Sequence, residues 1–193
     1  MIYHCDHADE EALDLLEEAK DWVLTGPAVG VIISSIKALE DANDPANAPA
    51  IDELKQLFED NCWTHNEMRR RGIPVVVGGD YGFAVTPQGT NARDLEHFVR
   101  HYGFSEAGTL QCATLTGARA MDMADELGQI REGFLADMLL VDGNPLDDIT
   151  IMQDKERFLM IMKDGEIHQP AVMKRAEPGA PAGNWLAAAP GDA

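Results

Sequence analysis

An apolar segment that ends in two glycines and an aspartate is the feature that most constrains the fold of this chain. The run Ile73-Pro-Val-Val-Val-Gly-Gly-Asp80 leads into a Gly- and Asn-containing loop, and a helical pattern begins near Asn91. A short apolar strand followed by a loop and a helix is typical of parallel α/β folds, where active-site residues lie at the carboxyl ends of strands. On this pattern alone two interpretations of Asp80 stay open: a catalytic carboxylate, or a side chain that caps a tight turn.

The segments before this strand predict an alternation of strands and helices. The expected elements are a strand end over 1–5, a helix over 9–21, a strand over 22–33 interrupted by Gly26-Pro27, a connector over 41–50 and a helix over 51–71. This β-α-β-α-β order implies parallel strands with right-handed crossovers, and therefore an α/β fold.

The pattern changes in the last third of the chain. Helices are expected over 91–102 and from Ser105 to a point before Gly128. Strands follow over 133–143 and 157–165, and Asp164-Gly165 predicts a hairpin turn after the second. Residues 169–193 are rich in Ala, Pro and Gly, a composition that predicts a disordered tail.

The charge and the cysteines exclude several classes of protein. The 193 residues carry a net charge of −19, which opposes binding to nucleic acid or to anionic membranes. The sequence shows no apolar run of about 18–20 residues and no leader pattern. Three widely spaced cysteines predict no disulfide framework. We therefore expect a cytoplasmic protein with neither nucleic-acid nor membrane partners.

Several motifs, in one order, resemble the metal-dependent amidohydrolases, in particular the branch of the imidazolonepropionases and prolidases. Val-Gly-Gly-Asp80 is similar to the Gly-Thr-Asp that usually ends the last barrel strand of that family. The resemblance covers roughly residues 2–168, and its other segments are Ile2-Tyr-His4-Cys, 89–95, 112–120, 127–137, 141–148 and 161–165.

The resemblance implies the C-terminal part of a TIM-like (β/α)8 barrel plus part of a small β-sandwich domain. Residues 1–126 would supply about strands six to eight with their helices, 127–168 the strands of the small domain, and 169–193 the tail. A complete barrel takes about 250 residues. The family pattern also includes a His-x-His pair, a lysine or other bridging residue, and a further histidine on earlier strands. His4-x-x-His7 does not match that pair.

The resemblance also assigns site residues. Asp80 is expected to bind a divalent metal, expected to be Zn²⁺, and to accept a proton from metal-activated water, and His4 to be a second metal ligand. Tyr81, Gln88 and Asn91 are expected to contact the substrate, although Gln88 stands where many relatives carry histidine. Because a catalytic zinc usually takes three protein ligands, we expect this chain alone to bind the metal weakly or not at all.

Two functional hypotheses remain at this point. The first is an amidohydrolase that cleaves a carbon–nitrogen bond of a small amide-type substrate, and that is active only with a partner that supplies the missing strands. The second is a non-catalytic half-barrel that associates with itself or with another fragment through open strand edges.

The remaining histidines have structural interpretations. His7 is expected to be a solvated residue at a helix start, His65 a hydrogen-bonded core residue, and His97 and His101 solvent-facing residues of an outer helix.

Overall fold

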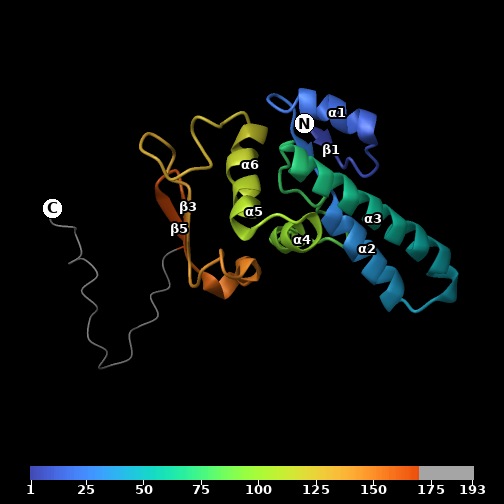
Figure 1. The fold of residues 1–193 in the computed structure, drawn as a ribbon. Coiled ribbons are helices and arrows are strands. Elements are labelled where there is room, and N and C mark those ends of the chain that lie inside the picture. Colours follow the sequence, from blue (N-terminus) through green and yellow to red (C-terminus); the bar gives the residue numbers. More distant parts are fainter. Residues whose placement is uncertain (170–193) are drawn as a thin grey trace.

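The chain forms a mixed α/β structure in a computed structural model that describes residues 1–169. Figure 1 shows its elements. They are β1 (Ile2–Tyr3), α1 (Glu10–Glu18), β2 (Thr25–Gly26), α2 (Val29–Asp41), η1 (Pro45–Asn47), α3 (Ala48–Arg71), α4 (Arg93–Tyr102), α5 (Glu106–Ala113), α6 (Leu115–Ala120), β3 (Met138–Val141), η2 (Ile149–Gln153), η3 (Lys155–Arg157), β4 (Phe158–Lys163) and β5 (Glu166–Gln169). Apart from Gln169, which ends β5, the tail expected over 169–193 lies outside the described residues.

The helices begin and end where local chemistry favours it. The Asp9 side chain accepts the Ala12 N–H at 2.9 Å and caps α1. Gly72 adopts a left-handed φ of 68° and ends α3, and Ser105 caps α5 by accepting from Gly108. The helices predicted over 9–21, 51–71 and 91–102 are therefore confirmed, with ends displaced by a few residues.

The strand predicted over 22–33 is wrong for most of its length. Only Thr25–Gly26 is a strand, and Val29–Asp41 is the helix α2. The β-branched run was ambiguous because Val29, Ile32, Ile33 and Ile36 also follow helical spacing. Val29 and Ile32 are buried, and α2 packs against α3 as a helical hairpin (Figure 1).

Three parallel chain segments form the sheet at the amino-terminal end. β1 pairs with β2 in the register Ile2↔Thr25 and Tyr3↔Gly26. Thr25 in turn bridges Val75, with the Thr25 N–H bonded to Pro74 O at 3.0 Å. The predicted parallel arrangement is thus present, with β2 in the middle, and the strands within residues 1–169 do not close into a barrel.

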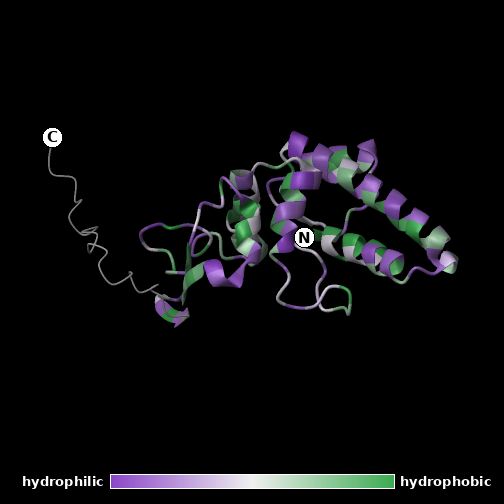
Figure 2. Cartoon of the chain, turned by 90° about the horizontal axis from the view of Figure 1, so that it is seen from below, coloured by the Kyte–Doolittle hydropathy of each residue, from purple (hydrophilic) through white to green (hydrophobic). Residues whose placement is uncertain are grey.

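Helices pack against the 73–75 segment of this sheet. The buried core joins α1, α2, α3, α4 and α5 to the 73–75 segment through Leu13, Val29, Met68, Ile73, Val75, Phe98, Tyr102 and Cys112. Figure 2 shows hydrophobic and hydrophilic bands alternating along the long helices, as expected for helices with one buried face. No helix in residues 1–169 is long and apolar enough to cross a lipid bilayer.

A separate antiparallel sheet contains β3, β4 and β5 in that order. Asp164 and Gly165, with φ of 51° and 78°, form the tight turn between β4 and β5, so the predicted hairpin is confirmed. Buried Ile149 and Ile151 lie in η2, which packs against α4 and links this sheet to the helices.

Candidate functional site

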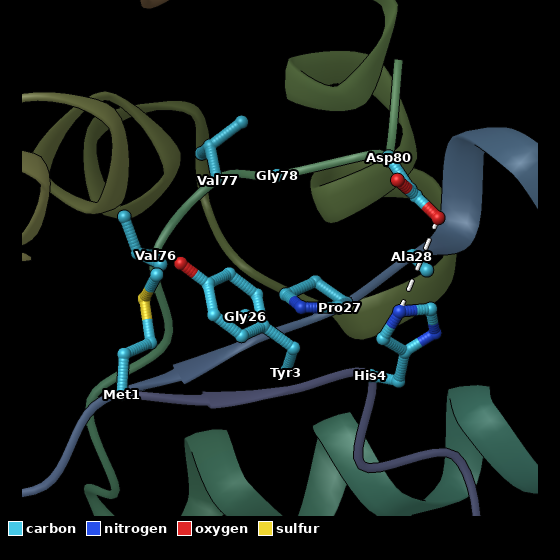
Figure 3. Close-up of a pocket in the computed structure, with 10 residues that line it drawn as sticks. All are labelled: Met1, Tyr3, His4, Gly26, Pro27, Ala28, Val76, Val77, Gly78 and Asp80. Atoms are coloured by element: carbon cyan, nitrogen blue, oxygen red, sulfur yellow. Dashed lines mark ion pairs between the residues drawn. The ribbon is translucent and has the colours of Figure 1, made fainter. Parts of the chain in front are cut away.

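His4 and Asp80 face each other at the carboxyl ends of the outer parallel segments. His4 directly follows β1, and Asp80 follows the extended segment beyond Val75. His4 Nε2 lies 3.9 Å from Asp80 Oδ2, and Figure 3 shows the two side chains pointing toward one another. They border a cavity of about 210 Å³ whose other lining residues are Met1, Tyr3, Gly26, Pro27, Ala28, Val76, Val77 and Gly78.

The backbone at both residues is left-handed. His4 has a φ of 68°, Cys5 of 55° and Asp80 of 55°, a region that non-glycine residues rarely adopt. The His4 N–H bonds to Gly26 O at 2.7 Å, and the Asp80 carbonyl accepts the hydroxyl of fully buried Thr86 at 3.2 Å. Unfavourable backbone conformations held by their surroundings occur often at functional sites.

A second carboxylate lies on the other side of His4. Asp6 Oδ2 is 3.9 Å from His4 Nδ1, while Asp6 Oδ1 accepts the Asn61 side-chain N–H at 2.7 Å. Buried Asn61 in turn accepts the hydroxyl of buried Tyr102. The imidazole therefore lies between two carboxylates, one of which is anchored to the core, and this arrangement attracts a cation.

The three residues expected to contact the substrate lie on the loop after Asp80, outside the cavity lining. The Tyr81 hydroxyl donates to Asp94 Oδ1 at 3.0 Å. The Gln88 amide donates to Tyr81 O at 3.3 Å, and Asn91 Oδ1 accepts the Gly89 N–H at 3.1 Å. Gln88 and Asn91 are exposed, whereas Tyr81 is half-buried.

The sequence analysis missed Asp94. This residue of α4 is only 1% exposed, and burial raises the pKa of its carboxyl to about 6, against the opposing effects of the Tyr81 hydrogen bond and the Arg93 charge. Asp94 shares the buried face of its helix with Phe98 and Tyr102, at spacings of four and eight residues. An acid on an apolar helix stripe was the signal that could have found it.

The other histidines divide into two groups. His7 is exposed and pairs with Asp60 at 3.0 Å, and buried His65 bonds through Nδ1 to Asn61 O at 2.8 Å, so both expectations are confirmed. Burial lowers the pKa of His65 to about 4. The expectation of solvent-facing residues is wrong for His97 and His101, which are half-buried. His101 lies against Phe58 of α3, and His97 lies against His101.

The His4–Asp80 pair fits part of a metal site. Zinc–ligand bonds of about 2.0–2.2 Å allow two donor atoms at this separation to share one ion. Within residues 1–169, however, no group of three or more His, Cys, Asp or Glu side chains is placed to hold a metal. The described residues thus bring together two side chains with metal-binding atoms, fewer than the three protein ligands usual at a catalytic zinc.

The chain is similar to known enzymes in sequence. Ochratoxinase of Aspergillus niger is 24% identical over 168 residues, which are 86% of this chain and 33% of the relative. Imidazolonepropionase of Caldanaerobacter subterraneus subsp. tengcongensis is 27% identical over 144 residues, or 75% of this chain and 29% of the relative. The chain therefore spans about a third of the length of these curated relatives.

Solved structures share the fold. The crystal structure of A. niger ochratoxinase matches 87% of this chain and 36% of its own, with a TM-score of 0.73. A putative prolidase from Bifidobacterium longum, 22% identical, matches 91% of this chain and 43% of its own, with a TM-score of 0.76. The profile of the amidohydrolase family matches residues 4–168, and the chain belongs to that family.

Proposed function

We propose that this chain forms the C-terminal part of an amidohydrolase active site that cleaves a carbon–nitrogen bond of a small amide-type substrate. The observation that carries the proposal is the approach of His4 Nε2 to Asp80 Oδ2, 3.9 Å apart, at the ends of parallel segments beside a cavity. Membership of the amidohydrolase family supports it. In this assignment residues 1–126 correspond to the last barrel strands and their helices, and 127–168 to the small β-domain.

Each residue has a role in this proposal. A divalent metal, when bound, would make water a nucleophile near neutral pH. His4 and Asp80, whose side chains are 51% and 43% exposed, would hold this metal together. Asp80 would accept a proton from the attacking water and return it to the leaving nitrogen. Tyr81, Gln88 and Asn91 contact the substrate from the loop that follows Asp80.

The remaining metal ligands come, in this proposal, from a further polypeptide segment. The curated relatives are about three times as long as their matched region, and residues 1–169 supply only two of the donors. A strand of that segment can pair with the free edge of β1, because β1 pairs only with β2 among the described strands.

Zinc titration with and without a complementing fragment tests the proposal. The chain alone is expected to retain less than stoichiometric zinc after dialysis. Mixed with a polypeptide encoded directly upstream of its gene, it is expected to retain zinc and hydrolyse amides. Asp80→Asn and His4→Ala should abolish both properties. His7→Ala should keep them, because exposed His7 pairs with Asp60 away from the cavity. Full zinc retention and activity in Asp80→Asn would overturn the assignment.

A second candidate is a non-catalytic fragment that associates through its exposed strands. Exposed apolar side chains on and beside β1 favour it: Met1 is 50% exposed, Ile2 47% and Tyr3 67%. Analytical ultracentrifugation separates the two candidates. A monomer that gains activity only with the complementing polypeptide supports the enzyme, whereas a stable oligomer that remains inactive with it supports the fragment.

A further inference from the structure

A buried carboxylate fills the space beneath the turn that carries Asp80. Asp94 reaches from the first turn of α4 to the backbone of Gly79 and Gly30. A methyl group added at Gly79 would overlap both Asp94 Oδ2 and the Tyr81 ring, and one added at Gly30 would lie 2.8 Å from Asp94 Oδ1. Glycine is therefore required at position 79 because the side chains of Asp94 and Tyr81 already occupy that volume.

Asp94 also holds Tyr81, the residue that directly follows Asp80. The Tyr81 hydroxyl donates to Asp94 Oδ1 at 3.0 Å, and the Arg93 guanidinium lies 6.0 Å from the centroid of the Tyr81 ring. This bond turns the Tyr81 side chain inward, beneath the turn, while Asp80 points outward to His4.

A second anchor acts directly on residue 80. The buried Thr86 hydroxyl donates to the Asp80 carbonyl at 3.2 Å, and the Gly82 N–H bonds to Thr86 O at 2.9 Å. Asp80 is thus fixed between Tyr81–Asp94 on one side and Thr86 on the other, with a φ of 55°. Because this conformation costs free energy, we expect the backbone at Asp80 to return to a commoner one when an anchor is lost.

We propose that Asp94 and Tyr81 are positioning residues that hold Asp80 in the left-handed conformation in which its carboxylate faces His4. The importance of this geometry for catalysis rests on the proposed function, but the geometry itself can be measured without activity. Tyr81 then acts on Asp80 through the backbone, in addition to any contact with substrate.

Nuclear magnetic resonance of the full chain tests the geometry. A left-handed residue gives a strong intraresidue amide–Hα Overhauser effect, and the His4 ring should show a contact to the Asp80 methylene. Asp94→Ala and Tyr81→Phe are expected to weaken both signals. Asp94→Asn is expected to retain them, because its amide oxygen still accepts the Tyr81 hydroxyl. Folded Tyr81→Phe or Asp94→Ala protein with both signals unchanged would overturn the proposal.

Substitutions of the adjacent residues Gly78 and Gly79 test the packing of Asp94 beneath the turn. A methyl group at Gly78 meets only Pro27 O, at 3.7 Å, so Gly78→Ala should be tolerated. Gly79→Ala should lower the melting temperature by roughly 5 °C more, and the double change Gly79→Ala/Asp94→Ala should recover part of that loss. Equal effects of the two glycine changes, or a fully additive double change, would contradict the packing.

The zinc affinity of the chain mixed with the complementing polypeptide distinguishes a failure of the positioning role of Asp94 from a failure of the proposed function. Asp94→Ala should weaken zinc binding by roughly tenfold or more, while Asp94→Asn stays close to the unmodified protein. Unchanged affinity in Asp94→Ala counts against the positioning role. If the unmodified complex binds no zinc, the proposed function fails, and the resonance and melting experiments still decide the positioning role.

Discussion

At the scale of single residues, the backbone conformations at and next to the cavity lower the stability of the folded chain. His4, Cys5 and Asp80 all have positive φ values, and an L-residue in this region costs about 1–2 kcal/mol. Aspartate tolerates the region better than most residues, so the cost at Asp80 lies at the lower end. The site therefore retains unfavourable conformations where glycine would be more stable.

The first prediction compares two replacements of Asp80. Asp80→Gly relieves the backbone, while Asp80→Ala keeps a Cβ in the same region. We expect the glycine variant to be about 1 kcal/mol more stable toward urea than the alanine variant. The same pair of changes at exposed Asp52, which lies within α3, should favour alanine instead and serves as the control. Equal stabilities of the Asp80→Gly and Asp80→Ala variants would contradict an unfavourable backbone conformation at position 80.

The second prediction concerns pH and Asp94. Burial raises the pKa of this carboxyl from 3.8 to about 6, so the folded state holds the proton more tightly than the unfolded state. Its stabilising contribution is complete below about pH 4 and is lost as the pH rises through 6. Asp94→Asn removes this dependence, so between pH 4.5 and 7.5 it should gain roughly 2 kcal/mol relative to the unmodified protein. Parallel urea midpoints across that range would refute the shift.

At the scale of elements, contact between η2 and α4 connects the antiparallel sheet to the helical part. Ile149 is 4% exposed and Ile151 8% exposed. Ile149→Ala is expected to cost about 2–4 kcal/mol and to speed amide exchange in β3, β4 and β5 ahead of the other elements. Ile130, which is 87% exposed, provides the control, since Ile130→Ala should change stability by less than about 0.5 kcal/mol.

Elements with strong local signals could be predicted from the sequence. Asp9 and Ser105 as caps, Gly72 as a stop and Asp164-Gly165 as a turn each act on their own neighbours. The error at α2 had a different cause, because Val29 and the residues after it suit a strand until α3 packs against them. Local preference was overridden there by tertiary packing.

The site was predictable only in part, for a related reason. His4 and Asp80 each end a parallel segment, so their position at one edge followed from the element order. Asp94 belongs to a helix that follows Asp80, and only the folded structure shows that it reaches back beneath Gly79. The burial of His101 likewise depends on Phe58 of α3, which lies far from it in the sequence.

At the scale of the molecule, strong negative charge and exposed apolar strands oppose each other. The net charge of −19 repels a second copy, whereas the free edge of β1 favours pairing. Salt screens the repulsion, so we expect the weight-average mass to rise between 50 and 500 mM NaCl. Tyr3→Lys, at a residue 67% exposed on β1, should suppress the rise, and an equal change at exposed Trp22 should not. A constant monomer mass at both salt concentrations would count against edge pairing.

The position of β2 between the two outer segments determines whether His4 and Asp80 can meet at all. Neighbouring strands lie about 4.8 Å apart, so the two backbones are separated by roughly two such spacings. Gly26, Pro27 and Ala28 occupy the interval, and Ala28 is 2% exposed. We expect a larger side chain at position 28 to push the His4 imidazole and the Asp80 carboxylate apart without changing either residue. The distance between the two side chains therefore depends on the size of residue 28 as well as on His4 and Asp80 themselves.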